Sequence, residues 1–164
     1  MKTLLFFRHG KSDWDAAFDH DHERPLARRG QKAARKMGRF LAAIGSCPDY
    51  IVASSAVRAR TTVELAADAG AWPACPRRVT DALYEAGPAD LLAEIRKTPD
   101  TRHRLMLVGH EPTWSETISR FIGGGAVRFP TAAMARVDLD IDHWADAAFG
   151  DGELIWLVIP KALP

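Results

Sequence analysis

Three short apolar segments, each ending abruptly in polar residues, constrain the fold of this chain more than any other feature. The segments are residues 4–7, 50–53 and 104–108. A continuous apolar run of this length is typical of a strand that is covered on both faces, as in the middle of a parallel sheet. Between the first two segments, apolar residues recur at helical spacing from about Arg28 until Gly45. This order of strand, helix and strand predicts an α/β fold.

The rest of the chain continues this alternation and ends in further strands. Helical spacing recurs in three segments: 59–67, 91–95 and 114–122. Short strands are predicted in three others: 79–83, 132–141 and 154–159. We therefore expect a three-layer αβα sandwich with a mostly parallel, mixed central sheet, in which Trp114 and Trp156 belong to the core. Because the 164 residues contain no linker or internal repeat, residues 1–164 are expected to form a single domain.

Charge is distributed unevenly along the chain. The formal net charge is +1, yet the first 60 residues hold 12 of the 22 Lys and Arg and only 6 of the 21 Asp and Glu. A basic part of this kind suits an anionic ligand, whereas nucleic-acid binding calls for a wider basic surface or a recognisable module. We expect an anionic ligand and no nucleic-acid partner.

Cysteine content and hydropathy indicate the compartment. Cys47 and Cys75 are the two cysteines, and they lack the CxxC spacing of a zinc site. The apolar stretch 3–7 is too short for the core of a signal peptide, and no run approaches the roughly 18 apolar residues of a membrane span. We expect a cytoplasmic protein that binds no membrane.

The polar residues that follow the three buried strands carry the candidate chemistry. Arg8 and His9 follow the first strand, Arg58 comes shortly after the second, and His110 follows the third. Because the carboxyl ends of parallel strands lie at one edge of a sheet, these two imidazoles and two guanidiniums are expected to converge. They would then surround one site, although they are about a hundred positions apart in the sequence.

Two imidazoles beside two guanidiniums suit phosphoryl transfer. The transition state spreads negative charge over three equatorial oxygens, so catalysis depends on aligned positive donors. The planar guanidinium group of arginine binds phosphate oxygens at two points. A neutral imidazole nitrogen attacks phosphorus without first losing a proton. His9 is the candidate nucleophile, with its other ring nitrogen donating to the backbone near Gly10.

The surrounding residues resemble the signatures of a known family. Three segments are similar to signatures of the histidine phosphatase superfamily, which has the phosphoglycerate-mutase-like fold: residues 8–14, 55–62 and 108–112. The segment 24–26 with Gly30 also matches the family's connection between loop and first helix. The matches occur in the expected order and cover most of the chain. The short length, with segments 24–26 and 83–84, is most similar to the SixA-type phosphohistidine phosphatases.

The resemblance implies a role for each matching residue. His9 would be the phosphorylated nucleophile. The phosphoryl group would be held by four side chains: Arg8, Ser12, Arg58 and His110. Glu85 lies where many members have their acid, which makes it the candidate proton donor to the leaving group. Asp15 stands where some relatives have asparagine and is not expected to bind phosphate, because a carboxylate cannot donate a hydrogen bond.

The implied reaction is a metal-independent and cofactor-independent hydrolysis through a phosphohistidine on His9. The substrate would be a protein that carries phosphohistidine or, instead, a small phosphorylated compound. Three alternatives stay open: a phosphatase of small phosphoesters, a mutase of the phosphoglycerate type, and a binding or regulatory module with a weak site. The first two alternatives use the same phosphoryl transfer to His9. The third would bind a phosphorylated ligand without turning it over.

Some of these side chains also have simpler explanations. Arg60 is interpreted as a surface charge of a helix, and Glu85 is equally well explained as a solvated loop carboxylate. The alternating Asp and His residues of 19–23 resemble a metal-binding tract, but alternating residues of a polar loop rarely face one centre. We interpret this tract as a solvated rim or as part of substrate recognition, and expect no metal site.

Overall fold

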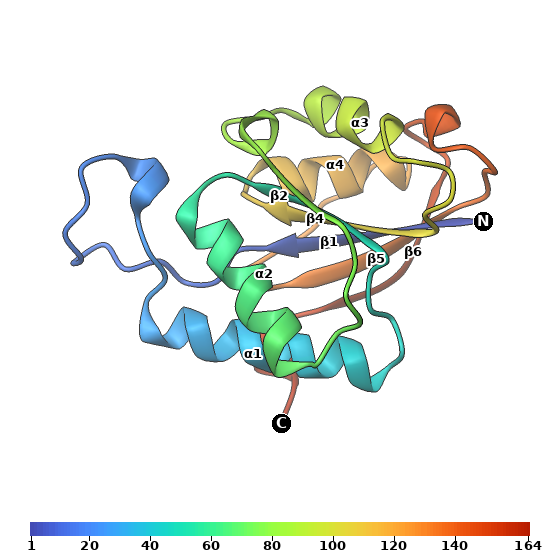
Figure 1. Cartoon of the computed structure of the whole chain (residues 1–164). Helices are drawn as coiled ribbons and strands as arrows, with labels where there is room; N and C mark the ends of the chain where they lie inside the picture. Colours follow the sequence, from blue (N-terminus) through green and yellow to red (C-terminus); the bar gives the residue numbers. More distant parts are fainter.

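A six-stranded mixed sheet lies between two layers of helices in the computed structural model, which describes residues 1–164 (Figure 1). The strands are β1 (Lys2–Arg8), β2 (Tyr50–Ser54), β3 (Arg77–Thr80), β4 (Arg104–Gly109), β5 (Met134–Leu139) and β6 (Gly152–Val158). Their order across the sheet is β3-β2-β4-β1-β5-β6. The first four strands of this order are parallel, whereas β5 runs antiparallel to both β1 and β6. The expected αβα sandwich with a mostly parallel mixed sheet is confirmed.

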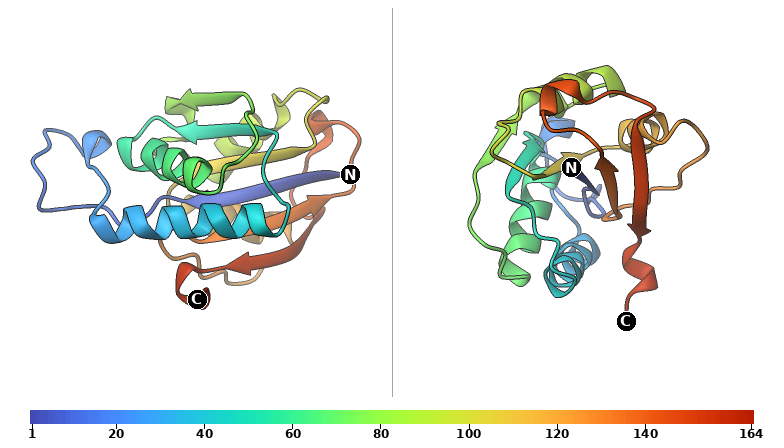
Figure 2. Two further views of the ribbon diagram at one scale, coloured as in Figure 1. Left: turned by 60° about the horizontal axis from the view of Figure 1, so that its bottom comes forward. Right: turned by 90° about the vertical axis from the view of Figure 1, so that its right-hand side faces the viewer.

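Two helices cover each face of the sheet. The helices are α1 (Arg28–Ala43), α2 (Val57–Ala69), α3 (Pro88–Arg96) and α4 (Thr113–Phe121). The first two pack side by side on one face, and α3 and α4 lie on the other (Figures 1 and 2). None of these helices combines the length and the hydropathy that spanning a bilayer would require.

The middle strand β1 shows why a short apolar run suffices to define this core. Leu5 and Phe7 point into the apolar cluster beneath α1 and α2, and Leu4 and Phe6 into the cluster beneath α3 and α4. All four side chains are fully buried. Each one contributes about 1.5–3 kcal/mol to folding through burial. The continuous run therefore corresponds to a strand covered on both sides, as predicted.

Two expectations for the periphery of the sheet are wrong. The third strand begins earlier than predicted and ends at Thr80, whose hydroxyl accepts a hydrogen bond from the Ala82 amide and starts the short 3-10 helix η2 (Asp81–Leu83). Trp156 is only partly buried, because β6 forms an edge of the sheet. Trp114, in contrast, is fully buried as expected.

The carboxyl ends of the three middle strands are level with one another. Phe7 of β1 and Ala53 of β2 are both paired with Val108 of β4. The loop that follows β1 projects beyond this edge and contains the 3-10 helix η1 (Asp21–Glu23) (Figure 1). At the start of this loop a Cβ on Gly10 would lie 2.7 Å from the Gly30 carbonyl oxygen. Two glycines are therefore needed where the loop passes the first turn of α1.

Candidate active site

A pocket of about 330 Å³ opens at the carboxyl edge of the middle strands. We call it the strand-end pocket. Its walls come from the ends of β1 and β4, the first turn of α2, the loop after β1 and the segment after η2. All six side chains that the sequence predicts for the site line it: Arg8, His9, Ser12, Arg58, Glu85 and His110. The structure thus brings together residues from four separate parts of the chain.

The ring of His9 is held in one orientation by the backbone. Its Nδ1 lies 2.7 Å from the carbonyl oxygen of Gly10. Because a carbonyl oxygen only accepts hydrogen bonds, Nδ1 carries the proton, and Nε2 keeps its lone pair. The residue is buried, with 7% of its surface exposed, and it lines the strand-end pocket. This is the tautomer and anchoring that nucleophilic attack through Nε2 requires.

Both imidazoles of the pocket are held in the neutral form. Burial, together with the positive charges of Arg58 and Arg8, lowers the pKa of His9 to about 4, although the bond to Gly10 opposes this shift. Burial and the neighbouring His9 and Arg58 lower the pKa of His110 to about 3. The two rings are tilted against each other with centroids 5.3 Å apart. A pocket at neutral pH therefore contains two uncharged rings among fixed cations.

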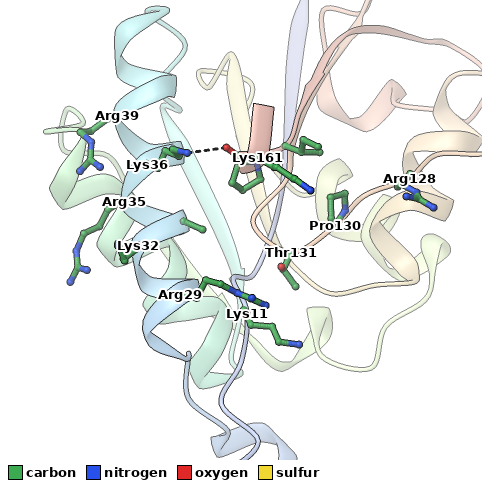
Figure 3. A pocket seen from close by; sticks show the side chains of 13 residues that line it. Lys11, Arg29, Lys32, Arg35, Lys36, Arg39, Arg128, Pro130, Thr131 and Lys161 are labelled. Carbon is green, nitrogen blue, oxygen red and sulfur yellow. Dashed lines mark hydrogen bonds between the residues drawn. The ribbon is translucent and has the colours of Figure 1, made fainter. Parts of the chain in front are cut away.

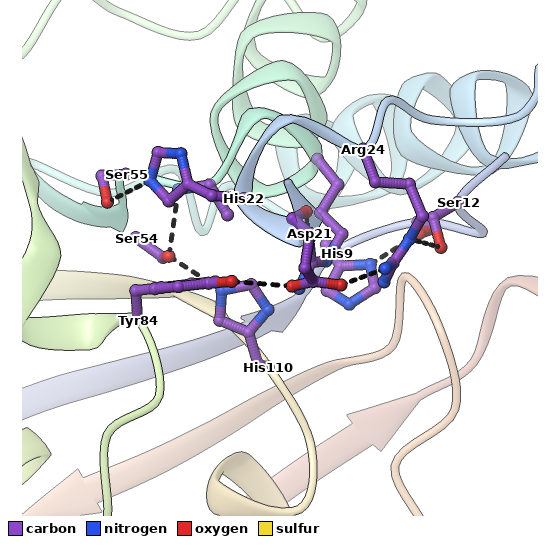
Figure 4. A network of polar contacts seen from close by, with 12 residues as sticks. His9, Ser12, Asp21, His22, Arg24, Ser54, Ser55, Tyr84 and His110 are labelled. Carbon is purple, nitrogen blue, oxygen red and sulfur yellow. Dashed lines mark hydrogen bonds and ion pairs between the residues drawn. The ribbon is translucent and has the colours of Figure 1, made fainter. Parts of the chain in front are cut away.

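The neutral ring of His110 is itself anchored. Its Nε2 lies 2.8 Å from the Ser54 hydroxyl at the end of β2, and its ring packs in T-shaped geometry against the rings of Tyr84 and Trp114. Since His110 follows β4 and Ser54 ends β2, this contact joins two of the three strand ends (Figure 4).

Arg58 owes its place to the start of α2. It lies in the first turn of that helix, is 6% exposed, and contacts Asp21 through both terminal nitrogens. Thr62, one turn later, donates to the Arg58 carbonyl at 2.6 Å and accepts from the Gly10 amide at 3.0 Å. This hydroxyl fixes the helix that carries Arg58 against the segment that carries His9.

Both predicted arginines keep hydrogen-bonding capacity that the protein does not use. One terminal nitrogen of Arg8 donates to the Phe129 carbonyl at 3.0 Å. The Nε groups of Arg8 and Arg58 are buried and have no acceptor. Buried donors without an acceptor are rare and costly, so holding the two guanidiniums at this edge of the sheet reduces stability.

Asp21, the most connected side chain of the pocket, was not predicted from the sequence to belong to the site. Its carboxylate accepts hydrogen bonds from Arg58 Nη2 at 3.0 Å and from the Tyr84 hydroxyl at 2.8 Å, and pairs with Arg24 (Figure 4). Burial alone would raise the pKa of Asp21, but these donors and the charge of Arg58 lower it to about 2. A permanent negative charge therefore lies among the cations of the pocket.

Arg24 is a further cation of the site that was not predicted from the sequence. It is 5% exposed, and its Nε donates to the Ser12 hydroxyl at 3.0 Å. Its guanidinium lies over the ring of Trp14, 3.7 Å from the centroid, and both residues line the pocket. Ser12 thus contacts Arg24 directly, and its own contact with substrate stays a prediction. The resemblance of segment 24–26 to the family was the available indication of Arg24.

The acidic and histidine-rich tract of the loop does not form a metal cluster. No three His, Cys, Asp or Glu side chains of the protein are grouped closely enough to hold a metal ion. Asp21 faces the arginines, and His22 lies 2.8 Å from the Ser55 hydroxyl and edge-on to Tyr84. Two of the five residues thus fold against the rim of the pocket instead of facing one centre.

Glu85 lines the pocket from an exposed position and in an unusual backbone conformation. Its φ is +55°, a left-handed conformation that residues other than glycine rarely adopt. Backbone strain of this kind concentrates at functional sites. Arg60 does not line the pocket; its Nε donates to the Ser55 carbonyl at 2.9 Å. Asp15 is exposed and also lies outside the pocket.

Comparison with protein families gives a match over most of the chain. Residues 4–122 match the model of the histidine phosphatase superfamily (branch 1). The uncharacterized protein MT1313 of Mycobacterium tuberculosis is 33% identical over 164 residues, which cover 94% of this chain and 99% of the relative. A 2,3-bisphosphoglycerate-dependent phosphoglycerate mutase of Mycobacterium leprae is 37% identical over 78 residues, covering 46% of this chain and 32% of the mutase.

Solved structures share the fold. A protein from Nakamurella multipartitia that was assigned as the phosphohistidine phosphatase SixA has a TM-score of 0.84 and 26% identity, covering 97% of this chain and 96% of its own. The protein histidine phosphatase SixA complexed with tungstate has a TM-score of 0.83 and 24% identity, covering 98% of each chain. The expected phosphoglycerate-mutase-like, SixA-type fold is confirmed by these likenesses.

Proposed function

Because the chain belongs to the histidine phosphatase superfamily, we propose that it removes phosphoryl groups from phosphohistidine on a partner protein, with His9 as the nucleophile. The observation that supports this most is the anchoring of His9. Its Nδ1 donates to the Gly10 carbonyl, and burial and nearby arginines keep the ring neutral at physiological pH. A neutral ring with a free Nε2 inside an arginine-lined pocket suits attack on a phosphoryl group.

The reaction takes two displacements. In the first, a bond forms between Nε2 of His9 and phosphorus while the bond from phosphorus to the substrate nitrogen breaks. The departing nitrogen keeps the electron pair of that bond and takes a proton from solvent. In the second, a water oxygen attacks the phosphorus. The nitrogen–phosphorus bond then breaks, Nε2 recovers its lone pair, and inorganic phosphate leaves. Both steps carry negative charge on the phosphoryl oxygens.

The cations of the pocket are proposed to stabilise that charge. Arg8 and Arg58 line the pocket, and His110 adds a neutral ring beside His9. The Asp21 carboxylate pairs with Arg58 and Arg24, so it serves as an anion supplied by the protein itself. Phosphoryl oxygens would take over these contacts as the loop carrying Asp21 moves outward. Donors fixed in advance stabilise a transition state more than the same groups in water.

The leaving group favours a phosphoramidate substrate. A phosphohistidine nitrogen departs readily, so the first step needs little help from an acid. An alkyl phosphoester has a poor leaving group and depends on proton donation. Glu85 is the carboxyl proposed to supply that proton, and it lines the pocket from an exposed loop position. This exposed position suits an accessory role in the hydrolysis of phosphohistidine.

The test is hydrolysis of a phosphohistidine-bearing carrier protein, followed by phosphate release with and without EDTA. We expect turnover in both conditions, and a loss of about 1,000-fold or more in His9→Asn. Asn keeps a donor for the Gly10 carbonyl but has no nucleophilic nitrogen, which makes it a better control than Ala. Undiminished turnover in His9→Asn would overturn the assignment of the nucleophile.

A mutase of the phosphoglycerate type is the second candidate, because part of the chain is similar to such an enzyme from Mycobacterium leprae. Incubation with a single phosphoglycerate isomer distinguishes a phosphatase from a mutase, because the two form different products. Inorganic phosphate is expected from a phosphatase, and the other isomer from a mutase. Tight phosphate binding with neither product would instead indicate a binding module.

A further inference from the structure

A second hollow of the molecule, much larger than the strand-end pocket, lies along α1. Its volume is about 1000 Å³. One wall is the face of α1, the other is the segment before β5, and the 3-10 helix η4 (Pro160–Ala162) closes one end (Figure 3). Lys36 of α1 donates to the carbonyls of Pro160 and Leu163, which fixes this end wall.

The lining of this hollow is basic and contains no acidic side chain. Eight of its residues are cationic: Lys11, Arg29, Lys32, Arg35, Lys36, Arg39, Arg128 and Lys161. We call the hollow the basic groove. None of these eight forms an ion pair with a carboxylate, although cations elsewhere, such as Arg58, Arg78 and Arg136, do. In a chain of net charge +1, this is a local concentration of unneutralised charge.

The basic groove adjoins the strand-end pocket. Lys11 and Thr131 line both. From this junction the cations follow α1 from Arg29 to Arg39, a rise of about 15 Å along a helix. An extended peptide covers that length with about four or five residues. A ligand whose phosphoryl group occupies the pocket would therefore have its neighbouring residues over the groove.

The lining distinguishes among polyanions. Single-stranded nucleic acid is bound on aromatic platforms, and no aromatic residue lines the basic groove. A lipid surface requires a flat or convex face with apolar side chains, whereas this site is concave. A compact polyphosphate needs cations that converge, but these are spread along a helix on long, mostly exposed side chains. An extended acidic peptide fits both the length and the spacing of the charges.

We propose that the basic groove binds an acidic segment next to the phosphorylated residue of the protein substrate. This inference rests on the proposed function, because it takes the substrate to be a protein. The groove would select among phosphorylated proteins by the charge of the flanking sequence, while the strand-end pocket acts on the phosphoryl group common to all. Contacts of this exposed kind steer association and weaken with added salt.

The experiment uses a matched pair of double variants, each removing two arginine charges. Arg29→Gln with Arg128→Gln removes two cations of the groove, and Arg28→Gln with Arg77→Gln removes two exposed cations outside it. Two phosphohistidine peptides serve as substrates, one with glutamates and one with glutamines beside the phosphorylated residue. We expect the groove variant to lower kcat/KM for the acidic peptide by about fivefold at low salt. The control variant should leave it unchanged, and neither should affect the glutamine peptide.

Binding is measured separately, so that the groove is tested whatever the enzyme does. Fluorescence anisotropy measures the binding of a labelled glutamate peptide that carries no phosphate. The groove variant should lower the affinity for this peptide by the same factor by which it lowers kcat/KM. If the glutamate and glutamine peptides bind and react alike, the groove proposal is wrong, and the phosphatase proposal stands. If no substrate is hydrolysed but the acidic peptide still binds through Arg29 and Arg128, the phosphatase proposal fails alone. If tripolyphosphate or an oligonucleotide displaced the labelled peptide more strongly than the unlabelled acidic peptide does, the assignment of an acidic peptide as the ligand would be wrong.

Discussion

The strand-end pocket and the basic groove are both rich in cations, yet the cations are held in opposite ways. Arg24 and Arg58 in the pocket are almost fully buried and paired with the Asp21 carboxylate. The groove cations that line α1 are more exposed and have no carboxylate partner. The two regions adjoin at Lys11 and Thr131, so they differ in the burial and pairing of their cations rather than in location.

This difference separates catalysis from recognition. Buried charges act in a medium that screens them little, and their geometry is fixed by neighbours such as Thr62 and Ser12. Exposed charges on long side chains are mobile and screened by salt. Changes in the pocket are therefore expected to have large effects that salt hardly alters, and changes in the groove to have small effects that salt abolishes.

The largest contrast is expected from Arg58→Gln. Loss of one fixed donor for the phosphoryl oxygens should lower kcat/KM for any phosphorylated substrate by about 100- to 1,000-fold. Steady-state kinetics at low and physiological ionic strength should give the same factor. Arg60→Gln, in the same helix but outside the pocket, is the control and should change the rate less than about threefold. A strongly salt-dependent loss in Arg58→Gln would remove the distinction between the two regions.

Glu85→Gln tests whether the exposed carboxyl of the pocket works as an acid. Hydrolysis of an alkyl phosphate should fall by about 100-fold, because its leaving group needs a proton. Phosphohistidine and p-nitrophenyl phosphate have good leaving groups and should be nearly unaffected. Parallel kcat measurements on the three substrates check this. An equal loss on all three would show that Glu85 has a structural role and is not the proton donor.

The pH dependence tests the state of the buried rings. The lowered pKa of His9, about 4, keeps it neutral and nucleophilic above that pH and protonates it below. After correction for substrate ionisation, kcat/KM should stay level from neutral pH to about 5 and then fall about tenfold per unit below 4. Long-range proton–nitrogen NMR of His9 should give the same midpoint, and Arg58→Gln should raise it. A His9 midpoint near 6.5 would contradict the account.

Asp21→Asn should give the smallest effect, and in the opposite direction. Removing this carboxylate leaves Arg58 and Arg24 without their internal anion, which makes them resemble the unpaired cations of the groove. Inorganic phosphate should inhibit the variant about fivefold more strongly than the natural protein. Asp19→Asn, a neighbour that does not line the pocket, is the matched control. Weaker inhibition in Asp21→Asn would mean that Asp21 orients the arginines for phosphate instead of competing with it.

Most of the fold follows from local patterns in the sequence. The runs of β1, β2 and β4 are long enough, and apolar enough, to define buried strands, and polar residues mark their ends. This explains why Arg8, His9, Arg58 and His110 could be placed at one edge of the sheet in advance. The prediction failed at Trp156, because an edge strand has the same composition as a covered one and differs only in its neighbours.

The parts of the site that were missed depend on contacts distant in sequence. Asp21 was one of five alternating polar residues, and nothing local distinguishes the one that turns inward. Its place is set by Arg58 and by Tyr84, 37 and 63 residues away. The cations of α1 likewise have, in the sequence alone, the spacing of an ordinary solvated helix face. The wall opposite them comes from residues near 128–131 and 159–161, which only the folded chain brings across.

The central claim is that the phosphoryl group is transferred to His9 during turnover. Trapping this phosphohistidine intermediate tests the claim most directly. The protein is mixed with a radiolabelled phosphohistidine substrate, quenched in alkali within the first turnover, digested, and analysed by mass spectrometry. The account predicts one alkali-stable and acid-labile phosphoryl group on the peptide that contains His9, and none in His9→Asn. Turnover with the label on another residue, or with no phosphorylated protein at any quench time, would contradict it.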